Sequence, residues 1–170
     1  VIGGLTKEID RRAEETLIRD ITDEGLSCTI LSEERGIIKI GSSPENLYLA
    51  CDPLDGTTNA VHGIPFIATS IAIAKEPSLT MVEAAVVMDI IHNITYIAEK
   101  GKGAYKNNER IQASQETDLI ESVIGVDINT YKAANKTLHE KITRIITLNK
   151  HPRYFGANAL QLCYVADGTI

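Results

Sequence analysis

Apolar residues near the start of the chain recur every three or four positions, with charged side chains between them. This spacing predicts an amphipathic helix. We expect Thr6 to cap its start and Gly25 to follow its end. Asp10 and Glu14 lie one turn apart on one flank, where acids in a first turn would complement the helix dipole. The apolar positions are Ile9, Ala13, Leu17, Ile18 and Ile21.

Two short apolar runs predict strands, and each ends at an acid. Residues 28–31 lead to Glu33, and residues 47–51 lead to Asp52. Because open α/β sheets place ligand sites beyond the carboxyl ends of strands, Glu33 and Asp52 can converge there. Two exposed loop acids are the alternative. Residues 37–46 are rich in Gly, Ser and Pro, so we expect a surface loop between these strands.

Further strand patterns follow without a crossover helix between them. Residues 66–74 alternate branched and small side chains, and the small face invites a helix to pack closely. Residues 82–88 and 93–98 are expected to pair through a turn, and residues 101–108 to add a short strand and an Asn-rich hairpin. We therefore expect an α/β (α+β) chain whose first sheet is mostly antiparallel or mixed.

A polar stretch at residues 112–118 is the candidate boundary between a lobe of residues 1–115 and the start of a second α/β lobe, residues 116–170. In the second lobe, Gly156 precedes a helix start and offers backbone N–H groups to an anion or a polyol. A plain strand-to-helix turn is the alternative. The other elements expected there are a strand at 122–126, a helix at 131–148 and a strand at 153–155.

Composition excludes several classes of protein. The 170 residues are 44% hydrophobic, which is typical of a soluble globular chain. A net charge of -6 argues against a nucleic-acid or anionic-membrane surface, and no apolar run approaches the roughly 20 residues that span a bilayer. Cys28, Cys51 and Cys163 are widely spaced and odd in number, so we expect reduced core thiols of a cytoplasmic protein.

Asp52 and Asp55 flank Pro53, which disfavours a helical conformation at Asp52 and favours a rigid turn that holds the two acids near each other. Two close anions repel each other unless a cation lies between them, and a divalent cation prefers such oxygen ligands. Gly56 and Thr57 add backbone N–H groups at a helix start and a hydroxyl, which suit a phosphate. An ordinary turn is the alternative, since these residues are turn formers.

Glu33–Glu34 followed by Asp52–Asn59 is a highly specific combination, and it resembles the inositol monophosphatase family of metal-dependent, lithium-sensitive sugar phosphatases. The archaeal branch, which acts on inositol phosphates and fructose 1,6-bisphosphate, is especially similar. The resemblance implies a layered αβαβα fold, a small phosphorylated sugar or polyol as substrate, and a homodimer. The supporting stretches are residues 6–14, 61–66, 101–105 and 155–166.

The resemblance also implies roles for individual residues. Glu33, Asp52 and the carbonyl of Leu54 would hold a first Mg²⁺, and Asp52 and Asp55 a second, of two or three ions in all. The remaining roles implied are water orientation by Asp10 and Thr57 with Glu33 nearby, phosphate binding by the N–H groups of Gly56 and Thr57, and substrate contacts by Asp55, Ala157 and Asn158.

The sequence departs from the family's pattern at Ala60, where an aromatic residue is usual. The resemblance places a further aspartate of the second metal site beyond Ile170. We therefore expect residues 1–170 to be a fragment that binds the first metal better than the second and lacks phosphatase activity. Two other functions stay open: a 3'(2'),5'-bisphosphate nucleotidase of the same superfamily, and a non-catalytic metal-binding relative.

Overall fold

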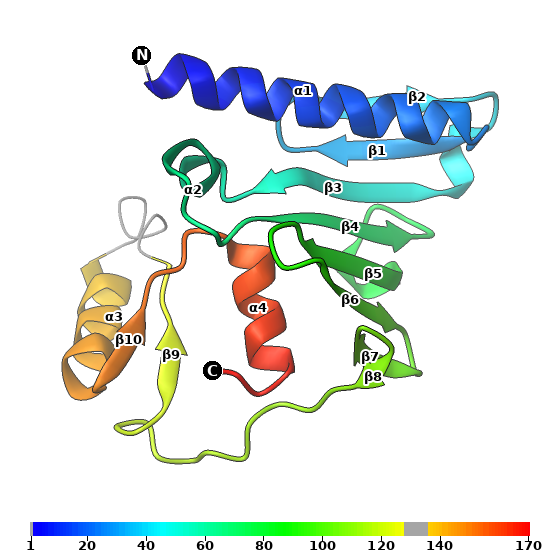
Figure 1. Ribbon diagram of the computed structural model, residues 1–170. Helices are drawn as coiled ribbons and strands as arrows, with labels where there is room; N and C mark the ends of the chain where they lie inside the picture. Colours follow the sequence, from blue (N-terminus) through cyan, green and yellow to red (C-terminus); the bar gives the residue numbers. More distant parts are fainter. Residues whose placement is uncertain (1, 128–135) are drawn as a thin grey trace.

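The structure is a computed structural model that describes residues 2–127 and 136–170. The strands of its main sheet are β1 (Cys28–Ser32), β2 (Gly36–Ile40), β3 (Tyr48–Asp55), β4 (Ala68–Ala74), β5 (Val82–Asp89), β6 (Ile94–Glu99), β7 (Gly103–Lys106) and β8 (Glu109–Arg110). They are ordered β2-β1-β3-β4-β5-β6-β7-β8 (Figure 1). β1 and β3 are parallel and all other neighbours are antiparallel, so the expected mixed sheet is confirmed.

Helices pack on both faces of this sheet because its strands are apolar on both sides. The helices are α1 (Ile2–Asp23), α2 (Thr57–His62), α3 (Lys136–Leu148) and α4 (Asn158–Ala166), with short 3-10 helices at Pro44–Asn46 and Leu79–Met81. α1 covers one face, where Ile21 packs with Ile30 and Leu49. α4 covers the other face, where Leu160 packs with Ala68 and Tyr96. The site described below lies between these two layers.

The expected N-terminal helix forms, but its start differs from the prediction. α1 begins at Ile2, so Thr6 lies inside the helix and the prediction that it caps the start is wrong. Asp10 and Glu14 also lie beyond the first turn, so complementing the helix dipole does not explain them. Gly25 follows the helix end with φ 70°, as expected.

The loop predicted at residues 37–46 is wrong for residues 37–40, which form a strand. Gly36, with φ 74°, closes a tight turn, and the chain returns antiparallel to β1 as the edge strand β2. Ile38 and Ile40 pack against the core cluster below α1, whereas Ile37 is 69% exposed. The alternation is that of a short edge strand with one apolar face. A 3-10 helix at Pro44–Asn46 follows it.

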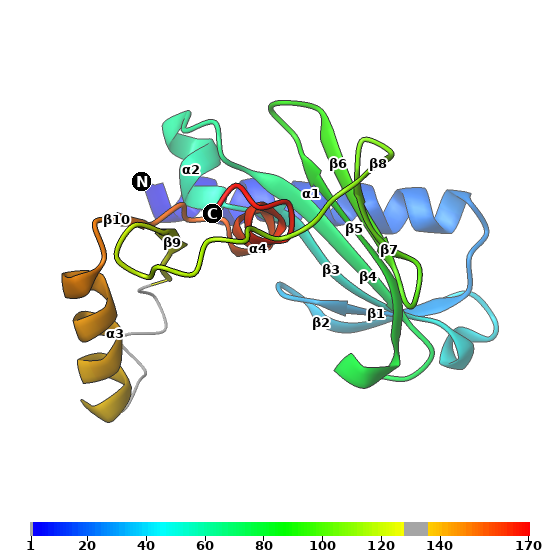
Figure 2. The ribbon, with the colours of Figure 1, turned by 90° about the horizontal axis from the view of Figure 1, so that it is seen from below.

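The last third of the chain contains a two-stranded parallel sheet of β9 (Val123–Gly125) and β10 (His151–Arg153). β10 ends at Arg153, so the prediction of a strand at 153–155 was wrong for residues 154 and 155. Residues 136–148 are helical as expected, and residues 131–135 lie outside the described residues. α3, β9 and β10 stand to one side of the large sheet in both views (Figure 2).

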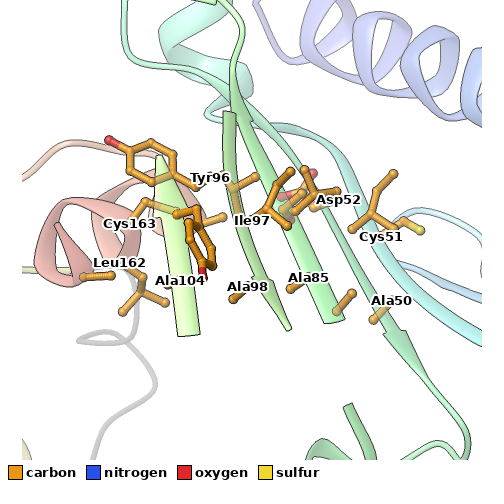
Figure 3. Close-up of a pocket in the computed structure, with 18 of the residues that line it drawn as sticks. Ala50, Cys51, Asp52, Ala85, Tyr96, Ile97, Ala98, Ala104, Leu162 and Cys163 are labelled. Carbon is orange, nitrogen blue, oxygen red and sulfur yellow. The ribbon is translucent and has the colours of Figure 1, made fainter. Parts of the chain in front are cut away.

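A helix packs on the small face of β4, as expected: α4 contacts β3, β4 and β5. It covers only part of that face. Beside it lies an apolar cavity of about 630 Å³ (Figure 3). Its lining includes Ala50, Ala85, Ala98, Ala104 and Leu162. None of the described helices combines the length and apolar character that a membrane-spanning helix needs.

Candidate active site

The parallel pairing of β1 and β3 brings two acids to one edge of the sheet. Ser32 is aligned with Cys51, so Glu33 and Asp52 follow at the same level. Both line a cavity of about 300 Å³, and the predicted convergence of these acids is therefore seen in the structure. The whole lining is Asp10, Glu33, Glu34, Asp52, Pro53, Leu54, Asp55, Gly56, Thr57, Asn158 and Ala159.

The chain around Pro53 remains in the sheet instead of leaving it in a turn. β3 runs to Asp55, but its pairing with β4 is irregular between Asp52 and Asp55. Pro53 has no N–H to donate, and its carbonyl accepts a hydrogen bond from the Thr69 hydroxyl at 2.8 Å. The N–H of Leu54 donates to Asp52 Oδ1 at 3.1 Å, which orients that carboxylate.

The start of α2 contacts α1 through a pair of polar side chains. Thr57 Oγ1 donates a hydrogen bond to Asp10 Oδ1 at 2.6 Å, and the Leu54 carbonyl lies farther away, at 3.2 Å. The single hydroxyl proton goes to the nearer acceptor, so the oxygen's lone pairs remain free to accept a hydrogen bond from a water. The pair predicted to orient water is thus brought together, across 47 residues of sequence.

Asp55 joins the strand end to the start of α4. Its Oδ1 accepts the N–H of Asn158 at 3.0 Å, and its Oδ2 accepts the N–H of Ala159 at 2.6 Å. Beside it, Gly56 has φ 93°, and a Cβ there would lie 3.0 Å from the Ala157 Cβ. A carboxylate is favourable at a helix N-terminus. The contacts place the predicted substrate-binding residues against the predicted metal-binding loop.

The cavity is strongly acidic. Five carboxylates line it, and none of its described lining residues is Lys, Arg or His. Burial raises the pKa of Asp52 to about 6, and the charges of Asp55, Glu33 and Asp10 add to this rise while the Leu54 N–H opposes it. Burial also raises the pKa of Asp55, against the N–H groups of α4. Such a site is stabilised by a bound cation.

The donors fit a hard divalent cation in kind, because all of them are carboxylate, hydroxyl or carbonyl oxygens. Within residues 2–127 and 136–170, no three His, Cys, Asp or Glu side chains already lie in position around one metal ion. The acids thus share a cavity without forming a closed cage, and Asp55 is hydrogen-bonded to α4. The larger apolar cavity shares Glu33 and Asp52 with the acidic one but offers few polar groups.

The raised pKa of Asp52 predicts how pH affects the metal-free protein. Between about pH 4 and 6 the folded protein holds a proton that the unfolded chain, with the ordinary value of 3.8, has lost. The contribution of Asp52 to the free energy of unfolding therefore increases as the pH falls through this window. As the pH falls from 7 through 6 to 5, the thermal midpoint of the wild type should rise more than that of Asp52→Asn. Identical slopes would contradict the assignment.

Three residues near the site have no role in the site predicted from the sequence. Glu34 lines the cavity beside Glu33. Asn59 is buried in α2, and its side chain donates to the carbonyls of Phe66 and Phe155. Glu14 is 1% exposed on α1. The signal for Glu14 in the sequence is its position one helical turn after Asp10, and Glu34 and Asn59 belong to the motif that resembles the family.

Comparisons with known proteins give a consistent result. The sequence pattern of the Inositol monophosphatase family matches residues 3–170. The fructose-1,6-bisphosphatase/inositol-1-monophosphatase of Methanothermobacter thermautotrophicus is 33% identical over 98% of this chain and 60% of its own.

Solved structures agree in fold. The extragenic suppressor protein suhB from Bartonella henselae is 32% identical with a TM-score of 0.79, over 96% of this chain and 63% of its own. Inositol monophosphatase II from Staphylococcus aureus is 26% identical with a TM-score of 0.78, over 99% of this chain and 63% of its own. SaIMPase-II structures with bound inositol monophosphate and with bound 2'AMP match as well. The chain spans 60 to 63% of the length of these relatives.

Proposed function

The chain belongs to the inositol monophosphatase family, a family of metal-dependent phosphomonoesterases, and from this we propose that the whole protein hydrolyses phosphate monoesters of small sugars or polyols with Mg²⁺. The observation that carries the proposal is the acidic cavity in which the Thr57 hydroxyl donates to Asp10. Inositol 1-phosphate and fructose 1,6-bisphosphate are the proposed substrates, by analogy with the named relatives.

We propose that Glu33, Asp52 and the Leu54 carbonyl hold one Mg²⁺, and that Asp52 and Asp55 contribute to a second. When bound, Mg²⁺ would lower the pKa of a water and neutralise charge on the phosphate and leaving oxygens. Glu33 and Asp52 supply negative charge from two adjacent strands. Asp55 keeps lone pairs available while it accepts two N–H groups, because a carboxylate has about four acceptor positions.

The protein's own part in the reaction is to place a water. The Thr57 hydroxyl donates its hydrogen bond to Asp10, so the lone pairs of Oγ1 accept a hydrogen bond from the attacking water. Asp10 holds the hydroxyl in this orientation and favours proton transfer away from the water, with Glu33 across the cavity as a further acceptor. Phosphoryl transfer needs positioning and charge more than covalent help.

The substrate would lie between the metal-binding loop and the start of α4. The N–H groups of Gly56 and Thr57 are proposed to hold the phosphate, with Asn158 against the sugar. Ala157, which the resemblance also places against the sugar, is 1% exposed, packs with Leu160 and does not line the cavity. Gly56 cannot be larger without contacting Ala157, so this wall of the cavity is closely packed. Asn158 Nδ2 is in turn held by Asp127 Oδ2 at 2.8 Å.

A phosphate-release panel tests this proposal. The whole protein, with Mg²⁺, should release phosphate from inositol 1-phosphate or fructose 1,6-bisphosphate, and Li⁺ should inhibit it. Adenosine 3',5'-bisphosphate and 2'AMP form the second arm, because a matching structure holds 2'AMP. Faster release in that arm would favour the nucleotidase. No release from any substrate, with Mg²⁺ still bound, would favour the non-catalytic relative.

We also propose a cytoplasmic location. Cys28 and Cys51 are free and buried, and Cys163 is free and half-buried. Burial raises the pKa of Cys51 and of Cys163 to about 12, so both remain protonated thiols. Such thiols persist in a reducing compartment.

A further inference from the structure

Glu14 is a buried acid outside the proposed site. It is 1% exposed on α1, and the Ser32 hydroxyl donates a hydrogen bond to its Oε1. Arg35 Nε lies 2.6 Å from its Oε2 as an ion pair, and no described residue donates a hydrogen bond to Oε2. Burial raises the pKa of Glu14, and the Arg35 charge opposes this. A buried carboxylate is costly, so its partners are expected to have a specific role.

These partners belong to the turn that carries Glu33. The Ser32 hydroxyl oxygen also accepts the N–H of Glu34 at 3.1 Å and of Arg35 at 3.2 Å. One hydroxyl therefore fixes both the turn and its contact with α1. The turn joins β1 to the edge strand β2, whose outer face is exposed, so few apolar contacts hold it.

The contact also decides where Glu33 points. Ser32 faces α1, like Cys28 and Ile30 of the same strand, which pack in the core below that helix. Glu33 is the first residue of the turn after β1, and it lines the acidic cavity together with Asp52. Its charge there contributes to the raised pKa of Asp52.

α1 thereby sets the distance between two halves of the site. Glu14 holds the Glu33 turn, and Asp10, one helical turn earlier, holds Thr57. We propose that Glu14 is a positioning residue for Glu33: through Ser32 and Arg35 it keeps the Glu33 carboxylate in place to bind Mg²⁺ beside Asp52. This inference rests on the proposed function for the role of Glu33.

The first test is Mg²⁺ binding by the whole protein, measured by titration calorimetry. Glu14→Gln should weaken Mg²⁺ binding about 10-fold, the usual scale for partners of metal ligands. Ser32→Ala, which changes no charge, should weaken it in the same direction. Glu15→Gln is the matched control, because Glu15 is exposed, pairs with Arg35 at 2.9 Å and does not contact Ser32. It should change the affinity less than about 2-fold.

A double-mutant cycle with Glu33→Gln separates positioning from general stabilisation. If Glu14 acts through Glu33, then Glu14→Gln should weaken Mg²⁺ binding less than about 2-fold in the Glu33→Gln background. A full 10-fold loss in that background would overturn the proposal. So would Glu14→Gln and Ser32→Ala variants that melt earlier but bind Mg²⁺ like the wild type when folded.

The same data distinguish this inference from the proposed function. A wild-type protein that binds Mg²⁺ with the expected cycle but releases no phosphate from any substrate overturns the activity and leaves the role of Glu14 intact. A wild-type protein that hydrolyses phosphate esters with additive Glu14 and Glu33 effects overturns the role of Glu14 alone. A wild-type protein that binds no Mg²⁺ overturns both.

Discussion

Replacing Asp52 by asparagine should reduce Mg²⁺-dependent phosphate release by at least about 100-fold, a loss of about 2.7 kcal/mol in transition-state stabilisation. Asp52 lines the acidic cavity, and its pKa is raised by burial and by the charges of Asp55, Glu33 and Asp10. An amide keeps the shape of the side chain but removes the charge that attracts a divalent cation. The measurement is kcat and the Mg²⁺ concentration for half activation, on the substrate that the panel identifies.

The thermal stability of the same variant should increase, although its activity falls. The metal-free Asp52→Asn protein should melt later than the wild type at pH 7, because a partly buried negative charge among other acids is gone. Asp23→Asn is the control, since Asp23 is exposed at the end of α1 and does not line the cavity. Wild-type activity in Asp52→Asn would refute its role. Loss of both activity and stability would indicate a folding defect instead.

Asn59→Leu should lower the free energy of unfolding by about 2–4 kcal/mol, because two partly buried carbonyls would lose their donor. Asn59 Nδ2 donates to Phe66 O at 2.8 Å and to Phe155 O at 2.7 Å, and Asn59 is 7% exposed. One bond joins α2 to the segment that precedes β4, and the other joins it to the segment that precedes α4. Urea denaturation followed by circular dichroism measures the change.

Asn46→Leu is a suitable control for that experiment, because Asn46 is exposed in the 3-10 helix before β3. It should change stability by less than about 0.5 kcal/mol. Equal unfolding free energies for the two variants would show that the Asn59 bonds contribute no net stability. The rings of Phe66 and Phe155 also stack, with centroids 4.7 Å apart, so part of the contact would persist in Asn59→Leu.

The sequence predicted the elements that have strong local patterns. β1 and β3 were found because their apolar runs end abruptly at acids, and their parallel ends bring Glu33 and Asp52 into one cavity. The strand β2 was missed because Gly41 and Pro44 nearby suggested a loop and because an edge strand has only one apolar face. Local composition does not distinguish such a strand from a polar connection.

The polar contacts could not be derived from the sequence, because each joins segments that are distant along the chain. Asp55 is expected from the sequence to face a metal and the substrate, yet both of its oxygens accept N–H groups of α4, about a hundred residues later. The burial of Glu14 depends on the Ser32 turn packing against α1. Periodicity shows which face of α1 carries Glu14, but not what covers that face.

The parallel alignment of β1 with β3 has a consequence for errors in folding. Leu49 and Cys51 pack in the core under α1, and Asp52 faces the other way. A slip of β3 by one residue would turn the carboxylate into the apolar core and expose the core side chains. Core packing therefore selects the one alignment in which Asp52 reaches the cavity. A chain trapped in the wrong alignment should lose activity and stability together, and proteases should remove it preferentially.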